Sequence, residues 1–439
     1  MSKRVLILTY YWPPGSGPGV QRWLKFSKYL VEFGWEPEIV TVRDGSYPSY
    51  DESLIDEIPS EIKVHKTRTV EPFKVFNVLT GKKGKKSSVG MSGIKDSGSP
   101  VKKLGLYVRA NFFIPDARMG WNKFAQKECA QLLNNNDYRA VITTGPPHST
   151  HLIGLKLKEK YDVNWIADFR DPWTGIYYNK FLPRTDSARK KDEELEKEVL
   201  KSADSVITVS EGLKQELAVI SGKKSGIEVL FNGFDTDDLP DRFEKRKDFF
   251  VLSYIGNYKD NQVVPELESA LEELRNEDEG FKNDFRLIIT GNISPQTSNR
   301  FQKSLGNAFI QEGFVQHKVA VEKMVSSGML LFVIPKTEGN HLILTGKLFE
   351  YLASGSDLLN IGPVDGNASK IIRSAERGEM FDYSDKASIK KTILNSYEKW
   401  KQRDKITEKF LLSDKVLQYS RKGQAKELIK IIENCRNED

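Results

Sequence analysis

The stretch TGKLFEYLASG, from Thr345 to Gly355, predicts a short helix whose first turn is suited to holding a phosphate group. Thr345 is a favourable N-cap, because its hydroxyl can accept a hydrogen bond from an early backbone amide, and Gly355 favours helix termination. Lys347 stands beside free amides and the positive end of the helix dipole, where an anion is stabilised. Glu350, one turn deeper, can accept two hydrogen bonds from a sugar diol. We therefore expect Thr345, Gly346 and Lys347 to bind the diphosphate of a nucleotide, and Glu350 its ribose.

The surrounding residues predict which strand precedes this helix and which side of the helix is buried. Residues 328–335, GMLLFVIP, are an uninterrupted apolar run that is typical of a buried strand in a parallel sheet. Leu348 and Leu352 stand four positions apart and give the helix a buried side, whereas Lys347 and Glu350 lie on another. An exposed amphipathic helix with a weak surface ion pair is the alternative that these residues leave open.

Strands and helices alternate along the whole chain. Strands are expected at 4–9, 35–42, 140–144, 204–210, 249–256, 284–291 and 358–362, with helices between them. Such alternation favours parallel sheets with right-handed crossovers. Because 439 residues are too many for one ordinary core, we predict an α/β fold with two Rossmann-like, doubly wound domains. The expected limits are 1–235 for the first domain, 236–248 for a linker, 249–412 for the second domain and 413–439 for a C-terminal helix.

The composition is that of a soluble globular protein, with 38% hydrophobic and 29% charged residues. Two cysteines argue against a disulfide framework or a zinc cluster as the basis of the fold, so a reducing cytoplasm is the expected setting. The five histidines show no metal-binding spacing, and no metal or other cofactor is expected. The first apolar run is too short for a signal peptide, and none approaches the roughly 20 residues that span a bilayer.

A loop rich in glycine and proline, residues 10–19, follows the first predicted strand and precedes a helix. This order presents backbone amides to an anion in α/β folds. Gly15, Gly17 and Gly19 do not form the GxGxxG pattern, which disfavours a dinucleotide-binding dehydrogenase. A tight turn with no ligand is the alternative for this loop.

Two further groups of polar residues directly follow predicted strands. His148 and His151 lie in the loop after residues 140–144, at a strand end where ligands gather in open parallel sheets. Asp168, Arg170 and Asp171 lie among aromatic residues in the run WIADFRDPW. Such charged residues form either a structural network or one that positions sugar hydroxyls.

Residues 81–103 predict a mobile insertion, because they are rich in lysine, glycine and serine and almost lack large apolar residues. Their lysines could contact an acidic membrane surface, although a solvated loop explains the composition as well. Residues 104–115, LGLYVRANFFIP, are aromatic and apolar, which core packing explains.

The run GKLFEYLASG resembles the nucleotide-sugar signature of GT-B glycosyltransferases of family 4, and VITVSEGL followed by VLFNGFD resembles the end of the first GT-B domain. The resemblance covers residues 4–235 and 249–435. It implies two domains facing across a cleft and a C-terminal helix that crosses back to the first domain. It also implies that Gly17 and Gly19 reach toward donor phosphates or acceptor, and that His148 contacts the transferring sugar.

The chain departs from the family pattern at several positions. Leu342 occupies the place of the first of two glutamates, with Glu338 four residues upstream. Asn257 and Val263 occupy the places of an arginine and a lysine that bind pyrophosphate, next to Gly256, and Lys259 could supply a charge from a shifted position.

The resemblance implies a glycosyltransferase that moves a sugar from a nucleotide-diphosphate sugar to a glycan or lipid-linked saccharide, with retention and without a metal ion. Asp168 and Arg170 would arrange the acceptor beside His148. A GT-B nucleotide-sugar epimerase and a catalytically silent nucleotide-sugar-binding subunit are the alternatives. Nucleic acid is not an expected partner, and peripheral contact with the inner face of the cell membrane is an open alternative to a purely cytoplasmic location.

Overall fold

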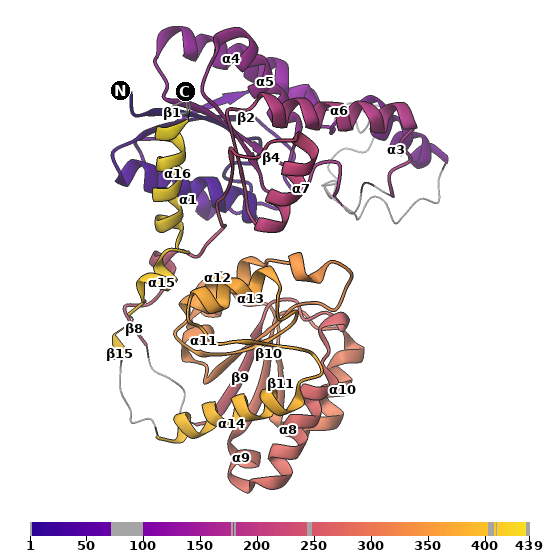
Figure 1. Cartoon of the computed structure of the whole chain (residues 1–439), viewed down its shortest axis with the longest axis vertical. Helices are drawn as coiled ribbons and strands as arrows, with labels where there is room; N and C mark the ends of the chain where they lie inside the picture. Colours follow the sequence, from indigo (N-terminus) through magenta and orange to yellow (C-terminus); the bar gives the residue numbers. More distant parts are fainter. Residues whose placement is uncertain are drawn as a thin grey trace. The chain divides into compact units, whose positions relative to one another are not determined.

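The computed structural model describes residues 2–71, 100–176, 179, 181–243, 248–402, 408–409 and 411–435. The chain forms two compact units: unit 1 comprises Met1–Asn232 and Gln424–Asp439, and unit 2 comprises Gly233–Gly423. Each unit is built on one parallel sheet (Figure 1), which confirms the predicted α/β class with two Rossmann-like domains. The units divide after residues 232 and 423, whereas the sequence placed the limits at 235 and 412.

The sheet of unit 1 has the strand order β3-β2-β1-β4-β5-β6-β7. Its strands are β1 (Arg4–Leu8), β2 (Glu36–Val42), β3 (Lys63–Thr67), β4 (Ala140–Gly145), β5 (Trp165–Phe169), β6 (Ser205–Thr208) and β7 (Ile227–Val229). β1 pairs with both β2 and β4, so that Leu6 lies opposite Glu38 on one side and Val141 on the other. The order therefore reverses between β1 and β4, and the loops that follow these two strands meet at the carboxyl edge of the sheet.

Helices cover both faces of this sheet (Figure 1). The helices on the sheet are α1 (Pro18–Glu32), α4 (Asn122–Asn135), α5 (Ser149–Tyr161), α6 (Asp186–Ser202), α7 (Glu211–Ser221) and α16 (Arg421–Asn434), whereas α3 (Pro100–Phe112) packs against α6. Because successive strand residues point to opposite faces, Val5 and Ile7 of β1 pack with α1 and α16, whereas Leu6 and Leu8 pack with α4 and α5. The C-terminal helix therefore packs on the sheet of unit 1, as expected.

The sheet of unit 2 has the order β11-β10-β9-β12-β13-β14. Its strands are β9 (Phe250–Ile255), β10 (Phe285–Thr290), β11 (Phe309–Glu312), β12 (Met329–Val333), β13 (Asp357–Ile361) and β14 (Met380–Phe381), and β8 (Arg242–Phe243) pairs separately with β15 (Glu408–Lys409). The order reverses between β9 and β12. The carboxyl ends of these two strands therefore mark the place where a ligand is expected.

The helices of unit 2 are α8 (Pro265–Glu277), α9 (Glu279–Asp284), α10 (Pro295–Leu305), α11 (His317–Ser326), α12 (Gly346–Ala353), α13 (Asn367–Ser374), α14 (Lys386–Gln402) and α15 (Asp414–Leu417). Tyr397 of α14 and Leu271 of α8 pack with Phe250 and Leu287 in the core on one face of the sheet. α12 and α13 lie on the other side in Figure 1, where Leu348 and Leu352 are buried. The predicted helix at 345–354 is thus present, with its apolar side inward.

One expectation about a segment needs correction. The insert predicted at 81–103 lies outside the described residues up to 99, but its last four residues are the first turn of α3. Near the C-terminus, β15 and the short helix α15 separate α14 from α16.

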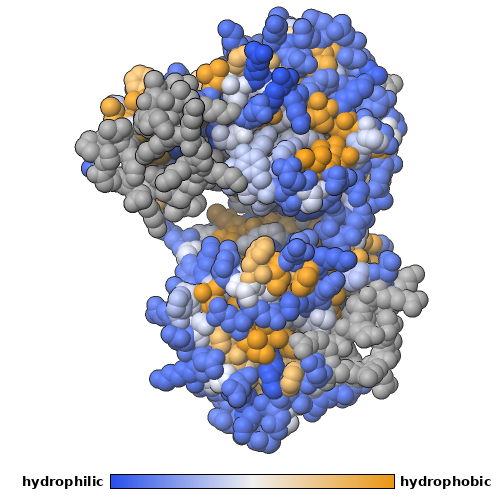
Figure 2. All heavy atoms as spheres, turned by 180° about the vertical axis from the view of Figure 1, so that it is seen from behind, coloured by the Kyte–Doolittle hydropathy of each residue, from blue (hydrophilic) through white to orange (hydrophobic). Residues whose placement is uncertain are grey.

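On the face that Figure 2 shows, both units are mostly hydrophilic, with hydrophobic side chains in separate groups. None of the helices in the described ranges is long and apolar enough to cross a membrane.

Candidate functional site

The first turn of α12 follows the carboxyl end of β12 in unit 2, after the loop 334–345. Thr345 has the extended backbone of an N-cap (φ −100°, ψ 146°), but its side chain makes no capping hydrogen bond, contrary to the expectation. Its hydroxyl is buried and has no partner among the described residues. Since the amides of a first helical turn need partners from outside the helix, an anion could satisfy them here.

Lys347 turns its ammonium group back toward the end of β9. Its Nζ lies 3.6 Å from the centre of the Tyr254 ring. A Cβ atom on Gly256, where φ is +123°, would stand 2.8 Å from that Nζ, so this close approach requires glycine. Burial lowers the pKa of Lys347 to about 7, opposed by Glu350 and assisted by the charge of Lys259. A bound diphosphate would stabilise the ammonium form.

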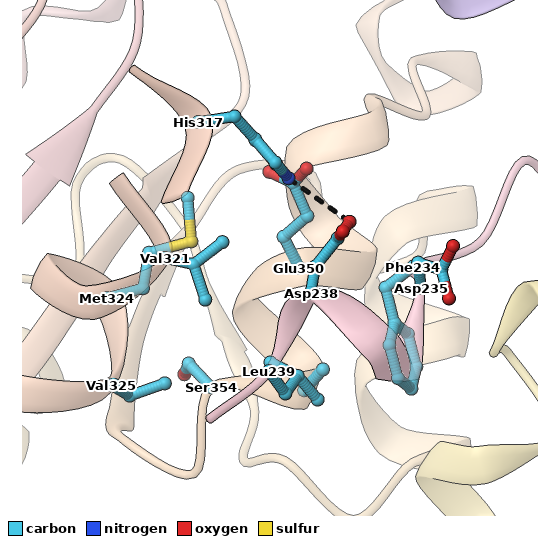
Figure 3. Close-up of a pocket in the computed structure, with 11 residues that line it drawn as sticks. Phe234, Asp235, Asp238, Leu239, His317, Val321, Met324, Val325, Glu350 and Ser354 are labelled. Carbon is cyan, nitrogen blue, oxygen red and sulfur yellow. Dashed lines mark hydrogen bonds and ion pairs between the residues drawn. The ribbon is translucent and has the colours of Figure 1, made fainter. Parts of the chain in front are cut away.

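Glu350 lines a small pocket within unit 2 (Figure 3). The pocket has an apolar side and a polar side, and its lining consists of Phe234, Asp235, Asp238, Leu239, His317, Val321, Met324, Val325, Glu350, Ala353 and Ser354. Burial raises the pKa of Glu350, whereas the charges of His317, Arg421 and Lys347 oppose the rise. The carboxylate makes no hydrogen bond or ion pair with the residues that the structure describes, so its oxygens can accept from a diol.

The predicted donor-binding residues of unit 2 therefore come together around the end of β9 and the start of α12. Gly256 and Lys347 are in close approach, and Lys259 is exposed on the loop after β9, near enough to affect Lys347. Leu342, at the place of the family's first glutamate, is exposed on a short 3-10 helix, Asn340–Leu342.

In unit 1, the glycine loop meets Arg170. Gly17 is the N-cap of α1, with φ +119°. A Cβ atom on Gly19 would stand 1.4 Å from Nη1 of Arg170, so only glycine leaves room for the guanidinium. Arg170 donates from Nε to the Gly145 carbonyl at 3.1 Å and from Nη2 to the Pro146 carbonyl at 2.6 Å. The loops after β1, β4 and β5 thus converge at one edge of the sheet, with a cation at the start of α1.

His148 and His151 stack in an aromatic group beside this cation. The His148 ring is parallel to that of Trp173, with 5.1 Å between centres, and the His151 ring is parallel to that of Phe169 at 4.5 Å. Thr143 Oγ1 lies 2.9 Å from Nδ1 of His151, whereas neither ring nitrogen of His148 has a hydrogen-bond partner in the described part of the chain. Burial, followed by the nearby His151 and Arg170, lowers the pKa of His148 well below its usual value. His148 is therefore a buried, neutral imidazole.

The Asp168 carboxylate, in contrast, already has hydrogen-bond partners. It is fully buried and accepts from the buried Arg22 guanidinium at 3.1 Å, from Trp23 Nε1 at 2.7 Å and from Thr144 Oγ1 at 2.9 Å. The structural alternative for Asp168 therefore fits the geometry better than direct contact with an acceptor, because no surface is left for a ligand. Asp168 joins β5 to α1 and so fixes the strand end from which Arg170 projects.

Several residues of the two sites were not predicted from the sequence. His317 and Asp238 are 79 positions apart, with 3.2 Å between Nε2 and Oδ2. Trp173, which stacks on His148, donates from Nε1 to Asp192 of α6 at 2.8 Å. No local pattern marks such pairs, because each depends on how separate elements pack.

The family model described as Glycosyltransferase Family 4 matches residues 91–238. A comparison with curated proteins gives no match. Sucrose-phosphate synthase from Thermosynechococcus elongatus is 12% identical, with a TM-score of 0.58 over 98% of each chain. HepE from Anabaena, solved with UDP and glucose, is 11% identical, with a TM-score of 0.54 over 98% of this chain and 99% of that one.

A variant of TarM from S. aureus was solved with Fondaparinux, alpha-GlcNAc-glycerol and UDP. It is 11% identical, with a TM-score of 0.53 over 98% of this chain and 99% of that one. These similarities at low identity establish the shared fold. Residues 91–238 match Glycosyltransferase Family 4, and the chain has the two-domain GT-B fold of these solved glycosyltransferases.

Proposed function

We propose that this glycosyltransferase takes a sugar from a nucleotide-diphosphate sugar, with UDP as the nucleotide, and transfers it to a saccharide acceptor. The observation that carries the proposal is the arrangement around α12. Lys347 stands at the uncapped first turn, against Gly256, and Glu350 presents an unpaired carboxylate to a pocket one turn later. This spacing fits a diphosphate and a ribose. HepE and the TarM variant were both solved with UDP, which supports the choice of base.

The chemistry follows from where negative charge grows as the sugar leaves. The departing diphosphate would lie on the amides of Gly346 and Lys347 and against the ammonium group of Lys347, each of which stabilises that charge without a metal ion. Metal-independent transfer is therefore part of the proposal. Retention of the anomeric configuration is proposed as well, on the resemblance to family 4.

Unit 1 supplies the residues proposed to meet the sugar and acceptor. His148 has two unpartnered ring nitrogens and remains neutral, so it can donate to or accept from a sugar hydroxyl. Arg170 is a half-buried cation at the start of α1. Asp168 is proposed to position Arg170 by fixing the end of β5 to α1. The TarM variant was solved with saccharide and glycoside ligands, which supports a glycan acceptor.

Replacing Glu350 tests this proposal directly. Glu350→Ala removes two hydrogen bonds to a charged acceptor, each worth about 1.5–3 kcal/mol, and should weaken UDP binding at least tenfold in calorimetry. The exposed Glu272 of α8 provides the matched control, Glu272→Ala, which should bind UDP normally. Equal affinities for Glu350→Ala and wild type would reject the assigned ribose site. Incubating UDP-sugars with candidate glycans then distinguishes UDP release by transfer from epimerisation of the free donor.

We also propose that unit 1 makes peripheral contact with an acidic membrane, through α3. Leu104 is 64% exposed and Phe112 is 71% exposed. Tyr107, Val108 and Phe112 follow Leu104 by three, four and eight positions, so the four side chains share one side of the helix. Lys103 and Arg109 belong to the same helix, and basic residues favour anionic lipids. Such a stripe suits a lipid-linked acceptor.

Vesicle binding tests the contact. The double variant Leu104→Ser/Phe112→Ser should co-sediment at least tenfold less with vesicles of phosphatidylglycerol, because burial of each large side chain contributes about 1.5–3 kcal/mol. Val219 of α7 is 84% exposed, and Val219→Ser is the matched control. Undiminished sedimentation of the double variant would exclude α3 as the contact.

A further inference from the structure

Three ionisable side chains from three separate elements meet at the polar side of the pocket in unit 2 (Figure 3). Glu350 comes from α12, His317 is the first residue of α11, and Asp238 ends the 3-10 helix Thr236–Asp238. Nε2 of His317 lies 3.2 Å from Oδ2 of Asp238 and forms an ion pair with it when protonated. Glu350 lines the same pocket, without a hydrogen bond to a described residue, and is close enough to His317 for the charge of each to affect the pKa of the other.

The charges around Glu350 act in opposite directions. Burial raises the pKa of Glu350, and the negative charge of Asp238 raises it further. His317, Arg421 at the start of α16, and Lys347 on the same helix each lower it. The hydrogen bond that His317 donates to Asp238, followed by the charge of Glu350, raises the pKa of His317 against the effects of burial and Arg421. The Asp238 and Glu350 carboxylates therefore favour the imidazolium form of His317.

We infer that His317 is a positioning residue for nucleotide binding: its imidazolium, held by Asp238, keeps the Glu350 carboxylate ionised and so sets the lower pH limit at which the ribose is bound. This inference rests on the proposed function, in which Glu350 accepts hydrogen bonds from the ribose hydroxyls. A protonated Glu350 has one oxygen that is no longer a free acceptor, so affinity should fall as pH falls through its titration.

UDP affinity measured by calorimetry from pH 4 to 8 tests the inference. In His317→Ala, Glu350 loses a neighbouring cation, and the midpoint of the acid limb should move upward by about one pH unit. In Asp238→Asn, Glu350 loses a neighbouring anion, whereas the amide oxygen of asparagine can still accept from the imidazole of His317, so the midpoint should not move upward. His317→Arg restores a permanent cation and should return the midpoint toward the wild-type value. Protonation of the UDP terminal phosphate, near pH 6, is common to all variants and cancels in the comparison.

The different shifts of the midpoint in the two variants distinguish this role from a purely structural one. Both His317→Ala and Asp238→Asn remove the same ion pair, so if that pair only held α11 in place, both would weaken binding alike at every pH. His65 and Glu38 form a similar pair in unit 1, with 3.0 Å between Nε2 and Oε2, and His65→Ala should leave the midpoint unchanged. Melting temperatures measured on each variant verify that it is folded.

Two results would overturn the inference, and they are distinguishable. If wild-type protein binds UDP with an acid limb but His317→Ala and wild type share one midpoint, the role of His317 is rejected and the proposed function stands. If wild-type protein binds no UDP at any pH, the proposed function fails and this inference fails with it.

Discussion

At the scale of single residues, the site is defined by charged side chains that are buried. Lys347 illustrates this, because burial lowers its pKa to about 7 and the unfolded chain would hold the proton more tightly. A lowered lysine pKa costs stability at every pH below the folded value, and the cost fades as pH rises toward 10. The residue that would bind phosphate therefore destabilises the fold in the absence of a ligand.

Replacing this lysine by methionine should expose the trade-off. Lys347→Met keeps the length of the side chain and removes the buried charge, so at pH 6 its melting temperature should exceed that of wild type by a few degrees, with a difference that shrinks above pH 7. UDP affinity should fall at least tenfold in the same variant. Scanning fluorimetry and calorimetry measure the two effects, and a lower melting temperature would show instead that the contact with Tyr254 is stabilising.

The residue scale also shows what sequence reasoning can reach. Lys347 and Glu350 were predicted because three helical positions place them on one side of a single turn. Asp168 was identified as part of a charged group, but its partner Arg22 lies 146 positions away, so the buried pair could not be foreseen. His317 gave no signal, since its role depends on a carboxylate from a different element.

At the scale of elements, strand ends and helix starts explain where the functional residues lie. Strands with continuous apolar runs, such as β1 and β12, were predicted within a residue or two. The edge strand β3, with the sequence KVHKT, was missed because one side of it lacks a neighbouring strand and its side chains are mostly polar. The contact between the start of α1 and the loop after β5 was not predicted either, although a glycine at position 19 is consistent with a close approach.

Gly19 provides a test of that meeting. Gly19→Ala would place a Cβ atom on the Arg170 guanidinium, which can swing away at small cost to stability because it is the end of a flexible side chain. Transferase turnover should therefore fall by a similar factor in Gly19→Ala and Arg170→Ala, and the double variant should be no slower than either. A Cβ atom added to Gly105 of α3 would meet no described atom within 4 Å, so Gly105→Ala is the control. Additive losses in the double variant would show that the two residues act separately.

At the scale of the whole molecule, the chain returns to its first unit after completing the second. The resemblance to GT-B enzymes implied this return, and α16 indeed belongs to the core of unit 1. The amide of Phe231 donates to the side chain of Gln424 at 2.7 Å, where the chain leaves and re-enters that unit. The sequence could not fix the limits at 232 and 423, because no change in composition marks them.

This connectivity predicts that a substitution near the C-terminus weakens the N-terminal unit. Leu428 of α16 is fully buried against residues of β1 and α1, and Leu428→Ala should cost about 2–5 kcal/mol of the stability of unit 1. Leu411 is 81% exposed, and Leu411→Ala should leave stability unchanged. Hydrogen exchange measured with and without UDP would locate the effect. In Leu428→Ala, amides of β1 and β2 should lose protection while UDP still protects α12, since the proposed nucleotide residues lie within unit 2. Loss of protection confined to unit 2 would contradict the assignment of α16 to the first core.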